Sequence, residues 1–361
     1  MAKPKRNKTF DYGLLVVVIL LIVVGLLILY STSSYNGKVK FDDEFYYLKK
    51  QFFATSLGLA CMYAMANIDY HVWKKFAVWA YAIALILSLA VLFIGDEYNG
   101  SKRWLSFGPL SFQPSEFAKL AVVLFLAYLI VTMEKKMKKM RFLLLIMLSI
   151  LPIVGLVGAS NLSTAIIILG MGVILVFVAS PLYAQFVWLA ISGVGFLAVF
   201  LALESYRLER IAIWRNPELY EKGYQTLQGL YAIGSGGLFG RGNGESIQKL
   251  GFVPEAQNDM IFSIVCEEWG LVGAAGLILL FLILIWRLFV IAVHAKDLFG
   301  TLIATGAMAH MMIQVILNIA VVTNTIPNTG ITLPFVSYGG TSVLFLLTEI
   351  GLVLNVSHLI E

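Results

Sequence analysis

Long apolar runs alternate with short polar segments along the whole chain. A helix needs about 20 apolar residues to cross the hydrocarbon core of a membrane. Counting on this basis predicts ten spans, near 12–31, 51–68, 74–94, 115–133, 142–159, 161–179, 183–203, 260–286, 299–322 and 338–357. The polar stretch SNLST at 160–164 and a bend at Pro152 separate the fifth span from the sixth. We therefore predict an all-α integral membrane protein, with residues 1–11 as an N-terminal tail and 12–358 as a single polytopic membrane domain.

The composition supports this fold class. Apolar residues make up 60% of the 361 residues and charged residues 13%, whereas a soluble domain has about 25% charged residues. The first run follows the basic stretch MAKPKRNK, but it is too long for a signal peptide and lacks a convincing A-x-A site, so we expect a retained span. Cys61 and Cys266 lie in apolar or near-apolar stretches. We expect two buried thiols there, without a disulfide framework or a metal knuckle.

The placement of the charges predicts the topology. The net charge of +5 would suggest acidic partners for a soluble protein, but in a membrane protein Lys and Arg gather in cytoplasmic loops. The N-terminal tail and the loop EKKMKKMR are both basic, so both are predicted to be cytoplasmic. An even number of spans then places the C-terminus inside as well. Four loops are predicted on the outer face, at 32–50, 95–114, 204–259 and 323–337, and the largest joins the seventh span to the eighth.

Candidate chemistry begins in the segment NGSKRWLSFGPLSFQPSEFAKL, which leads into the fourth span. Ser115 is predicted to cap this helix, so Glu116 and Lys119 form an i,i+3 ion pair at its outer end. An ordinary capped helix with an interfacial ion pair explains this pattern. So does an anion clamp, in which Lys102 and Arg103 also bind a diphosphate at the membrane surface.

The largest outer loop contains two glycine-rich stretches, GSGG at 234–237 and GRGNG at 240–244. Glycines permit tight turns and a close approach of the backbone to a ligand. Gly-rich outer loops are common, however, and the chain has no G-x-x-x-x-G-K-[ST] motif, so we predict no nucleotide site.

Asp259 closes this loop and opens the eighth apolar segment. It is either a helix cap or snorkelling carboxylate, or a functional group. Glu267 and Glu268 follow about two turns later, where the bilayer would begin to bury them. Either the first turns of this helix lie in a polar cavity, or the span itself starts near Gly270. Both alternatives place Asp259 beside a water-accessible cleft.

The stretch NTGITLPFVSYGGTS at 328–342 predicts irregular backbone leading into the last span. Such backbone is tolerated at membrane depth only where protein buries it or where it lines a cavity. Gln314, Asn318 and Glu349 are further polar groups within the last two spans, and we expect them to make hydrogen bonds between helices.

Four ordered motifs together resemble one family, the bacterial shape, elongation, division and sporulation proteins that polymerise peptidoglycan. The matching stretches are the segment before the fourth span, YQTLQGLYAIGSGGLFGRGNG, VPEAQNDMIFSIVCEEWG and ITLPFVSYGGTS, and they extend over essentially the whole chain. The NG before the basic pair and the long glycine stretch are more similar to the cell-division and sporulation branch. The resemblance implies a multi-pass protein of the bacterial cytoplasmic membrane that joins lipid II units at the outer face. It also implies a class B penicillin-binding transpeptidase as partner, contact with membrane lipid, and no nucleic-acid partner.

The resemblance also implies roles for individual residues. Asp259 matches the family's essential aspartate and is expected to act as general base on the acceptor sugar hydroxyl. The substrate-binding candidates that match family motifs are Lys50, Lys102, Arg103, Glu116, Lys119 and Ser337.

The chain departs from the family pattern at two places. Lys50 stands where many members have arginine, which keeps a positive charge but loses the bidentate fork. Asn161, within ASNLST, replaces a frequent aspartate, so a role that needs a charge there is in doubt.

The reaction itself needs a base for the attacking hydroxyl and positive charge for the departing diphosphate. We predict no certain cofactor, although a divalent cation, Mg²⁺ or Mn²⁺, is compatible with this chemistry. Two alternatives stay open. A flippase for the lipid-linked precursor should have cationic groups in the middle of several spans, whereas this chain concentrates them at span ends and in loops. A scaffold that only recruits the transpeptidase would leave the candidate residues free to vary.

Overall fold

The computed structural model of the chain describes residues 10–98, 101–107, 110–180 and 212–358. These ranges contain nine long helices: α1 (Tyr12–Phe41), α2 (Tyr46–Asn67), α3 (His71–Ile94), α4 (Pro114–Met133), α5 (Met140–Ser160), α6 (Leu162–Ala179), α10 (Ile261–His294), α11 (Leu298–Val322) and α12 (Gly340–His358). Eight of them, all except α2, are long and apolar enough to cross a membrane. The fold class is confirmed. The predicted span 183–203 lies outside the described residues, so the count of ten stays a prediction.

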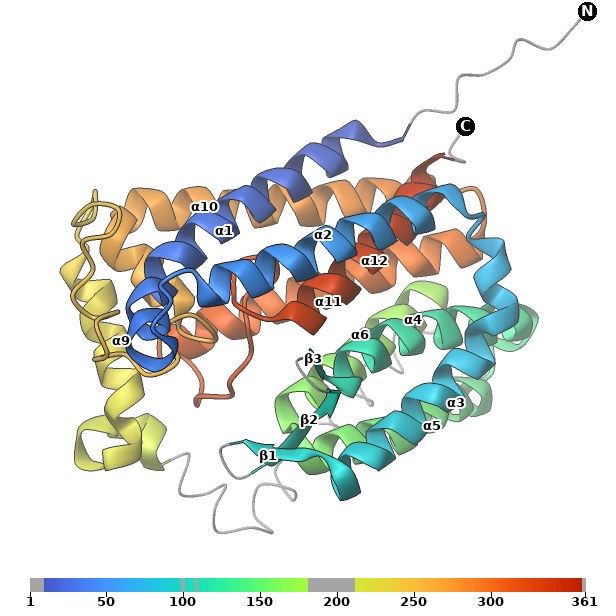
Figure 1. Cartoon of the computed structure of the whole chain (residues 1–361). Helices are drawn as coiled ribbons and strands as arrows, with labels where there is room; N and C mark the ends of the chain where they lie inside the picture. Colours follow the sequence, from blue (N-terminus) through green and yellow to red (C-terminus); the bar gives the residue numbers. More distant parts are fainter. Residues whose placement is uncertain (1–9, 99–100, 108–109, 181–211, 359–361) are drawn as a thin grey trace, which may run out of the picture.

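The long helices lie side by side, and both described ends of the chain are at one end of the bundle (Figure 1). There, the backbone N–H of Asp11 donates to Ser357 Oγ at 3.1 Å, and the rings of Phe10 and His358 meet edge to face at 4.6 Å. We call this end the terminal face. The opposite end, which holds helix α9 (Tyr224–Ser235) and Asp259, we call the Asp259 face. Both described ends of the chain at one face agree with an even number of spans, and the number itself stays a prediction.

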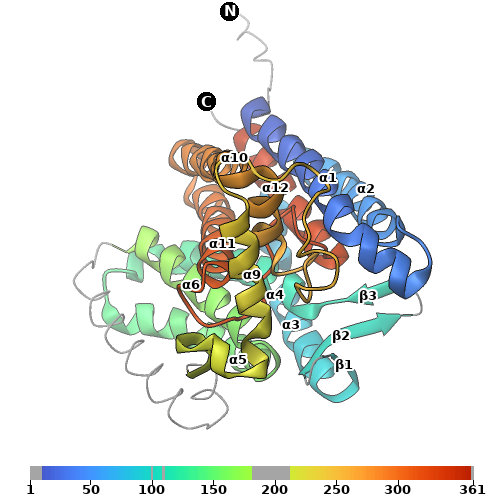
Figure 2. The ribbon, with the colours of Figure 1, turned by 90° about the vertical axis from the view of Figure 1, so that its left-hand side faces the viewer.

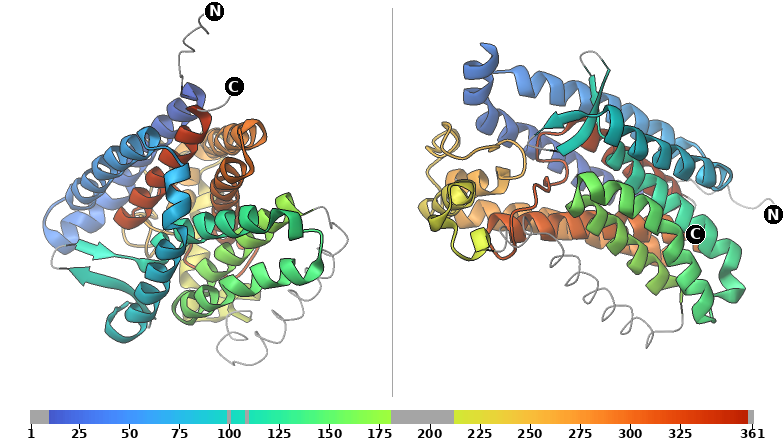
Figure 3. Two further views of the ribbon diagram at one scale, coloured as in Figure 1. Left: turned by 90° about the vertical axis from the view of Figure 1, so that its right-hand side faces the viewer. Right: turned by 90° about the horizontal axis from the view of Figure 1, so that it is seen from below.

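The side chains of α4 and α12 are the most extensively buried of the spans, because other helices surround them. From the terminal face, the group α3 to α6 lies beside the group formed by α1, α2, α10 and α12 (Figure 3). The peripheral helices leave large apolar side chains exposed, among them Trp79 on α3, Leu148 on α5 and Trp286 on α10. Apolar exposure of this kind suits helices that face lipid.

Several predicted boundaries were wrong. Helix α10 ends at His294, beyond the predicted end at 286, and α2 begins at Tyr46, before the predicted start at 51. Helix α1 continues to Phe41, ten residues beyond the predicted end at 31. The polar residues after Tyr30 suggested a loop, but Ser31 is buried against the loop that precedes α10, so protein surrounds the start of this extension. Residues 38–41 at its end are exposed. Ser115 does not cap α4. The cap position is Gln113, and Pro114 takes the first helical position, where its missing N–H costs nothing.

The loop between α3 and α4 adds a small sheet to the helical fold. Its strands are β1 (Asp96–Tyr98), β2 (Ser101–Phe107) and β3 (Leu110–Phe112), and they pair antiparallel in the order β1-β2-β3. Figure 2 looks at the Asp259 face and places these strands to one side of the bundle and α9 over its centre. The sheet therefore forms one border of the Asp259 face.

Candidate active site

Helix α10 is interrupted at Gly270, which adopts φ 66° and ψ −166°. An interruption leaves carbonyls before it and N–H groups after it without partners in the helix. The preceding loop bonds four of them: Arg241 N and Gly242 N donate to Glu267 O and Glu268 O, and Leu271 N and Val272 N donate to Gly237 O and Leu238 O. The part of α10 after Gly270, residues 271–294, is long enough to span a membrane. Of the two alternatives from the sequence, this break favours the span that starts near Gly270.

The glycines of the loop serve this backbone contact. A Cβ on Gly236 would lie 1.9 Å from Cys266 O, and a Cβ on Gly240 would lie 2.1 Å from Glu268 O. Only residues without a side chain allow the loop to approach the helix this closely. The predicted close approach is present, but its target is the chain's own backbone and not a ligand.

Glu267 and Glu268 attach the same loop with their side chains. Ser246 Oγ donates to Glu267, and Lys249 Nζ donates to Glu268 Oε1 at 2.7 Å. Ser31 Oγ on α1 also donates to Glu268, at 2.6 Å. Lys249 and both glutamates are buried, so these charges are satisfied by one another and by hydroxyl groups. The two glutamates therefore fix the loop to α1 and α10 rather than projecting into lipid.

Asp259 lies between this loop and the start of α10 and is 8% exposed. It does not cap the helix, whose cap position is Met260. Gln225 Nε2 on α9 lies 3.4 Å from Oδ1, the outer limit of a hydrogen bond. Burial raises the pKa of Asp259 to about 7, and the nearby carboxylate of Glu255 contributes to the rise. The carboxylate can therefore exchange a proton near neutral pH.

The irregular segment before α12 packs against Asp259. Asn318 Nδ2 on α11 donates to Asp259 O at 2.9 Å and to Ile331 O at 2.7 Å. Asn328 donates to Gln225 Oε1 at 3.2 Å, and a Cβ on Gly330 would lie 3.9 Å from Asp259 Oδ2. This segment is held by protein, as predicted for irregular backbone at the edge of a membrane. We expected Asn318 to make hydrogen bonds between helices, but both of these bonds go to backbone carbonyl groups outside the helices.

Ser337 is placed to shape the segment that carries Asp259. Its Oγ donates to Asn258 O at 2.6 Å and accepts from Leu333 N at 2.8 Å. On α2, Gln51 Oε1 accepts from Gly339 N at 3.0 Å, whereas the neighbouring Lys50 is exposed and donates to Tyr46 Oη at 2.6 Å. The structure brings Gln51 to the site, and Lys50 extends along its own helix.

Glu116 and Lys119 form the predicted i,i+3 pair, with 3.0 Å between Oε1 and Nζ. The pair is not interfacial, because the side chains are only 7% and 2% exposed. Lys119 Nζ also donates to Gln314 Oε1 at 3.0 Å, and Gln314 Nε2 donates to Thr332 O at 3.0 Å. In this conformation the pair supports the segment beside Asp259 from within the bundle.

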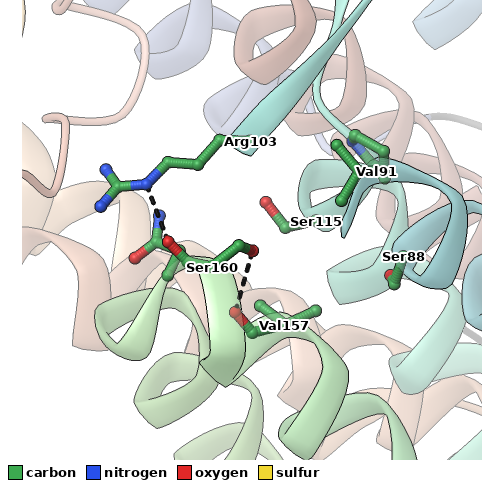
Figure 4. Close-up of a pocket in the computed structure, with 8 residues that line it drawn as sticks. Ser88, Val91, Arg103, Ser115, Val157 and Ser160 are labelled. Carbon is green, nitrogen blue, oxygen red and sulfur yellow. Dashed lines mark hydrogen bonds between the residues drawn. The ribbon is translucent and has the colours of Figure 1, made fainter. Parts of the chain in front are cut away.

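Arg103 projects from β2 toward the junction of α5 and α6, where its Nε donates to Ser160 O at 3.0 Å (Figure 4). Ser160 and Asn161 line a small cavity with Arg103, and Asn161 caps α6 by accepting from Thr164 N at 3.2 Å. Lys102 is further out and donates to Phe93 O at 3.3 Å. Asn161 thus lies beside Arg103 and caps α6 with an uncharged side chain.

The Asp259 face offers few protein ligands for a metal ion. In the ranges that the structure describes, no three His, Cys, Asp or Glu side chains are grouped to hold one. Asp259 and Glu255 provide two carboxylates near one another. A divalent cation there would need further oxygen ligands from substrate or water.

The chain matches one family of known proteins over nearly its whole length. A family model described as cell cycle protein, for FtsW, RodA and SpoVE, matches residues 12–360. The chain belongs to this family. Stage V sporulation protein E of Bacillus subtilis is 39% identical to it over 355 residues, which cover 96% of this chain and 97% of the relative. A probable peptidoglycan glycosyltransferase FtsW of Trichlorobacter lovleyi is 35% identical over 363 residues, covering 99% and 95%.

Solved structures of this FtsW, RodA and SpoVE family share the fold. A chain from a peptidoglycan synthase complex that coordinates polymerization and crosslinking is 31% identical with a TM-score of 0.80, covering 97% of this chain and 98% of that chain. RodA of Thermus thermophilus is 29% identical with a TM-score of 0.70, covering 97% of each chain. The relatives confirm the resemblance and a multi-pass membrane fold.

Several residues of the site were missed from the sequence. Gln225, Asn328 and Gln51 are uncharged amides in loops or at helix ends, and nothing in their local pattern marks them. Lys249 was also missed, although a lysine before a long apolar segment that opens with two glutamates could have been paired with one of them.

Proposed function

We propose that this protein is a peptidoglycan glycosyltransferase that polymerises lipid II, with Asp259 as the general base. The observation that carries the proposal is the position of Asp259. It lies at the mouth of α10, contacted by Gln225 of α9 on one side and by Asn318 of α11 on the other, with a pKa near neutrality. A base at this boundary can reach a polar sugar while the lipid tail of the substrate stays in the bilayer.

The chemistry follows from these groups. The acceptor sugar hydroxyl attacks the anomeric carbon of the donor, the bond to the diphosphate breaks, and Asp259 takes the hydroxyl proton. The lipid diphosphate leaves as an anion and does not need strong acid assistance. Arg103 and Lys102 on β2 border the same face, and they are proposed to bind that diphosphate.

The other binding candidates have different exposure. Lys50 is exposed on the same side of the bundle and is proposed to steer the anionic precursor. Glu116 and Lys119 are buried, so they are proposed to act through the loop they support. A divalent cation, if the reaction uses one, would bind at Asp259 and Glu255. Polymerisation should then fall on chelation with EDTA and recover with Mg²⁺ or Mn²⁺.

The partner and the topology are also proposals. The related synthase complex that coordinates polymerization and crosslinking supports a class B penicillin-binding transpeptidase as partner. The basic tail and the loop after α4 support a terminal face in the cytoplasm of a bacterial cell and an Asp259 face outside the cytoplasmic membrane. A cysteine at position 222 should react with an impermeant maleimide in intact cells. Labelling only after permeabilisation would reverse the topology.

The function is tested with purified protein and labelled lipid II, with and without the partner transpeptidase. A polymerase makes glycan strands in detergent, where no membrane separates two compartments. A flippase makes no polymer and instead moves labelled precursor between the leaflets of a vesicle. Translocation without polymer would overturn the proposal in favour of the transport alternative.

A further inference from the structure

A line of buried polar side chains continues from the Asp259 face into the bundle. Gln314 on α11 stands in the middle, with Lys119 Nζ donating to its Oε1 and its Nε2 donating to Thr332 O, both at 3.0 Å. One turn deeper, His310 Nε2 lies 2.9 Å from the same Oε1. His310 Nδ1 lies 2.7 Å from Glu349 Oε2 on α12. Both His310 and Glu349 are 2% exposed.

The hydrogen-bond partners determine where the protons are. The Lys119 ammonium can only donate and the Thr332 carbonyl can only accept, so the Gln314 amide has one possible orientation, with Oε1 toward Lys119. His310 Nε2 faces that oxygen and must therefore carry a hydrogen. One further proton lies between Nδ1 and the Glu349 carboxylate. Whichever of the two holds it, Nε2 remains a donor and the histidine–glutamate pair has no net charge.

We propose that His310 and Glu349 are positioning residues for the Asp259 site. Glu349 orients the imidazole, the imidazole Nε2–H holds the Gln314 amide, and Gln314 holds the carbonyl of Thr332. Thr332 follows Ile331, whose carbonyl shares the Asn318 amide with the backbone of Asp259. The chain of contacts thus extends from the middle of α12 to the backbone of Asp259. This inference rests on the proposed function only where activity is the readout.

The structure supplies a matched pair of substitutions. A glutamine side chain places its amide nitrogen near the position of the imidazole Nε2, and an asparagine places its amide near Nδ1. His310→Gln therefore keeps the donor toward Gln314, and His310→Asn keeps the contact toward Glu349 instead. Both are made together with Glu349→Gln, so that neither leaves a buried carboxylate without a partner.

The expected results separate positioning from packing. The Glu349→Gln single variant should retain activity within about threefold, because its amide can still donate to Nδ1 and maintain the Nε2–H form. The His310→Gln double variant should rescue activity to a similar level. The His310→Asn double variant should lose about tenfold or more in kcat with KM nearly unchanged, because it displaces a reacting group and leaves substrate binding intact. Equal activity of the two double variants, at equal melting temperature, would overturn the proposal.

A spectroscopic measurement tests the proton assignment without any assay of function. The chain has four histidines, so ¹⁵N-histidine labelling of the protein in lipid nanodiscs gives few imidazole signals, and the His310 signal is the one that disappears in His310→Gln. We expect its Nε2 to carry a hydrogen in the folded protein, because it faces the Gln314 Oε1 acceptor. An unprotonated Nε2 would overturn the inference even in an active enzyme. If the wild-type protein with its partner made no glycan, the proposed function would fail, and the nitrogen spectrum would still decide whether His310 holds Gln314.

Discussion

Replacing Asp259 with asparagine should make the folded protein more stable while it abolishes activity. Burial and the Glu255 carboxylate raise the pKa of Asp259 from the ordinary 3.8 to about 7. The folded state therefore binds this proton more tightly than the unfolded state, and the resulting stability is present below about pH 4 and lost as the pH rises to about 7. Above that pH the charged carboxylate costs the folded state about 4 kcal/mol, at about 1.36 kcal/mol for each pKa unit. Asparagine keeps the shape and an acceptor oxygen but has no charge to bury.

The assay compares melting temperatures of wild type and Asp259→Asn in detergent at pH 8.5 and at pH 5. We expect the variant to melt on the order of 5–10 °C higher at pH 8.5, and the difference to shrink at pH 5. Glu255→Gln is the matched control. It removes the neighbouring carboxylate and leaves Asp259 in place, so it should stabilise the protein at pH 8.5 by a smaller amount. A variant that is no more stable than wild type at pH 8.5, or a difference that does not change with pH, would refute the reasoning.

Three further predictions concern other parts of the molecule. Lys119→Met should lower the free energy of unfolding by about 3–5 kcal/mol, because it leaves the buried Glu116 carboxylate unpaired. Adding Glu116→Gln should restore the melting temperature, and failure to restore it would refute the pairing. At the terminal face, hydrogen bonds from the backbone and ring of His71 lower the pKa of Asp69 below its ordinary value. Asp69 therefore contributes about 1 kcal/mol or less to the stability of the fold. This contribution should be present above about pH 4 and lost as the pH falls further. Asp69→Asn should flatten that acid limb, and an unchanged melting profile would contradict it. Gly240→Ala should destabilise the folded protein by about 1–3 kcal/mol. Gly234→Ala is the control and should not destabilise it, because a Cβ there meets nothing within 4 Å. Equal melting temperatures of the two variants would contradict the contact of the loop with α10.

The spans and the ion pair of Glu116 with Lys119 could be predicted from the sequence because both are local. Helix length is a property of one apolar run, and an i,i+3 pair follows from the pitch of one helix. The position of Asp259 at the mouth of a span was predictable for the same reason. What surrounds it was not, because Gln225, Asn318 and Gly330 come from three separate segments.

The purpose of the glycine-rich loop could not be predicted either. The sequence indicates that GSGG and GRGNG approach something closely, but the partner is a break in α10, in a separate segment of the chain. Gly270 makes that break with its positive φ, and the backbone groups that it frees bond with Gly237, Leu238, Arg241 and Gly242. The burial of Ser31 could not be predicted for the same reason, because its partner lies in a separate segment. A polar residue inside an apolar helix indicates the end of a span until its partner, Lys249, is known.

The proposed role of Asp259 is tested most directly by glycan polymerisation from labelled lipid II with the partner transpeptidase present. Wild type, Asp259→Asn and Asp259→Glu are compared at equal amounts of folded protein, below the melting temperature of each. A general base predicts a loss of about 10² to 10⁴ in rate for Asp259→Asn. It also predicts little activity for Asp259→Glu, since one added methylene moves the carboxylate out of position. Substantial polymer from Asp259→Asn would contradict the role of Asp259 as the base.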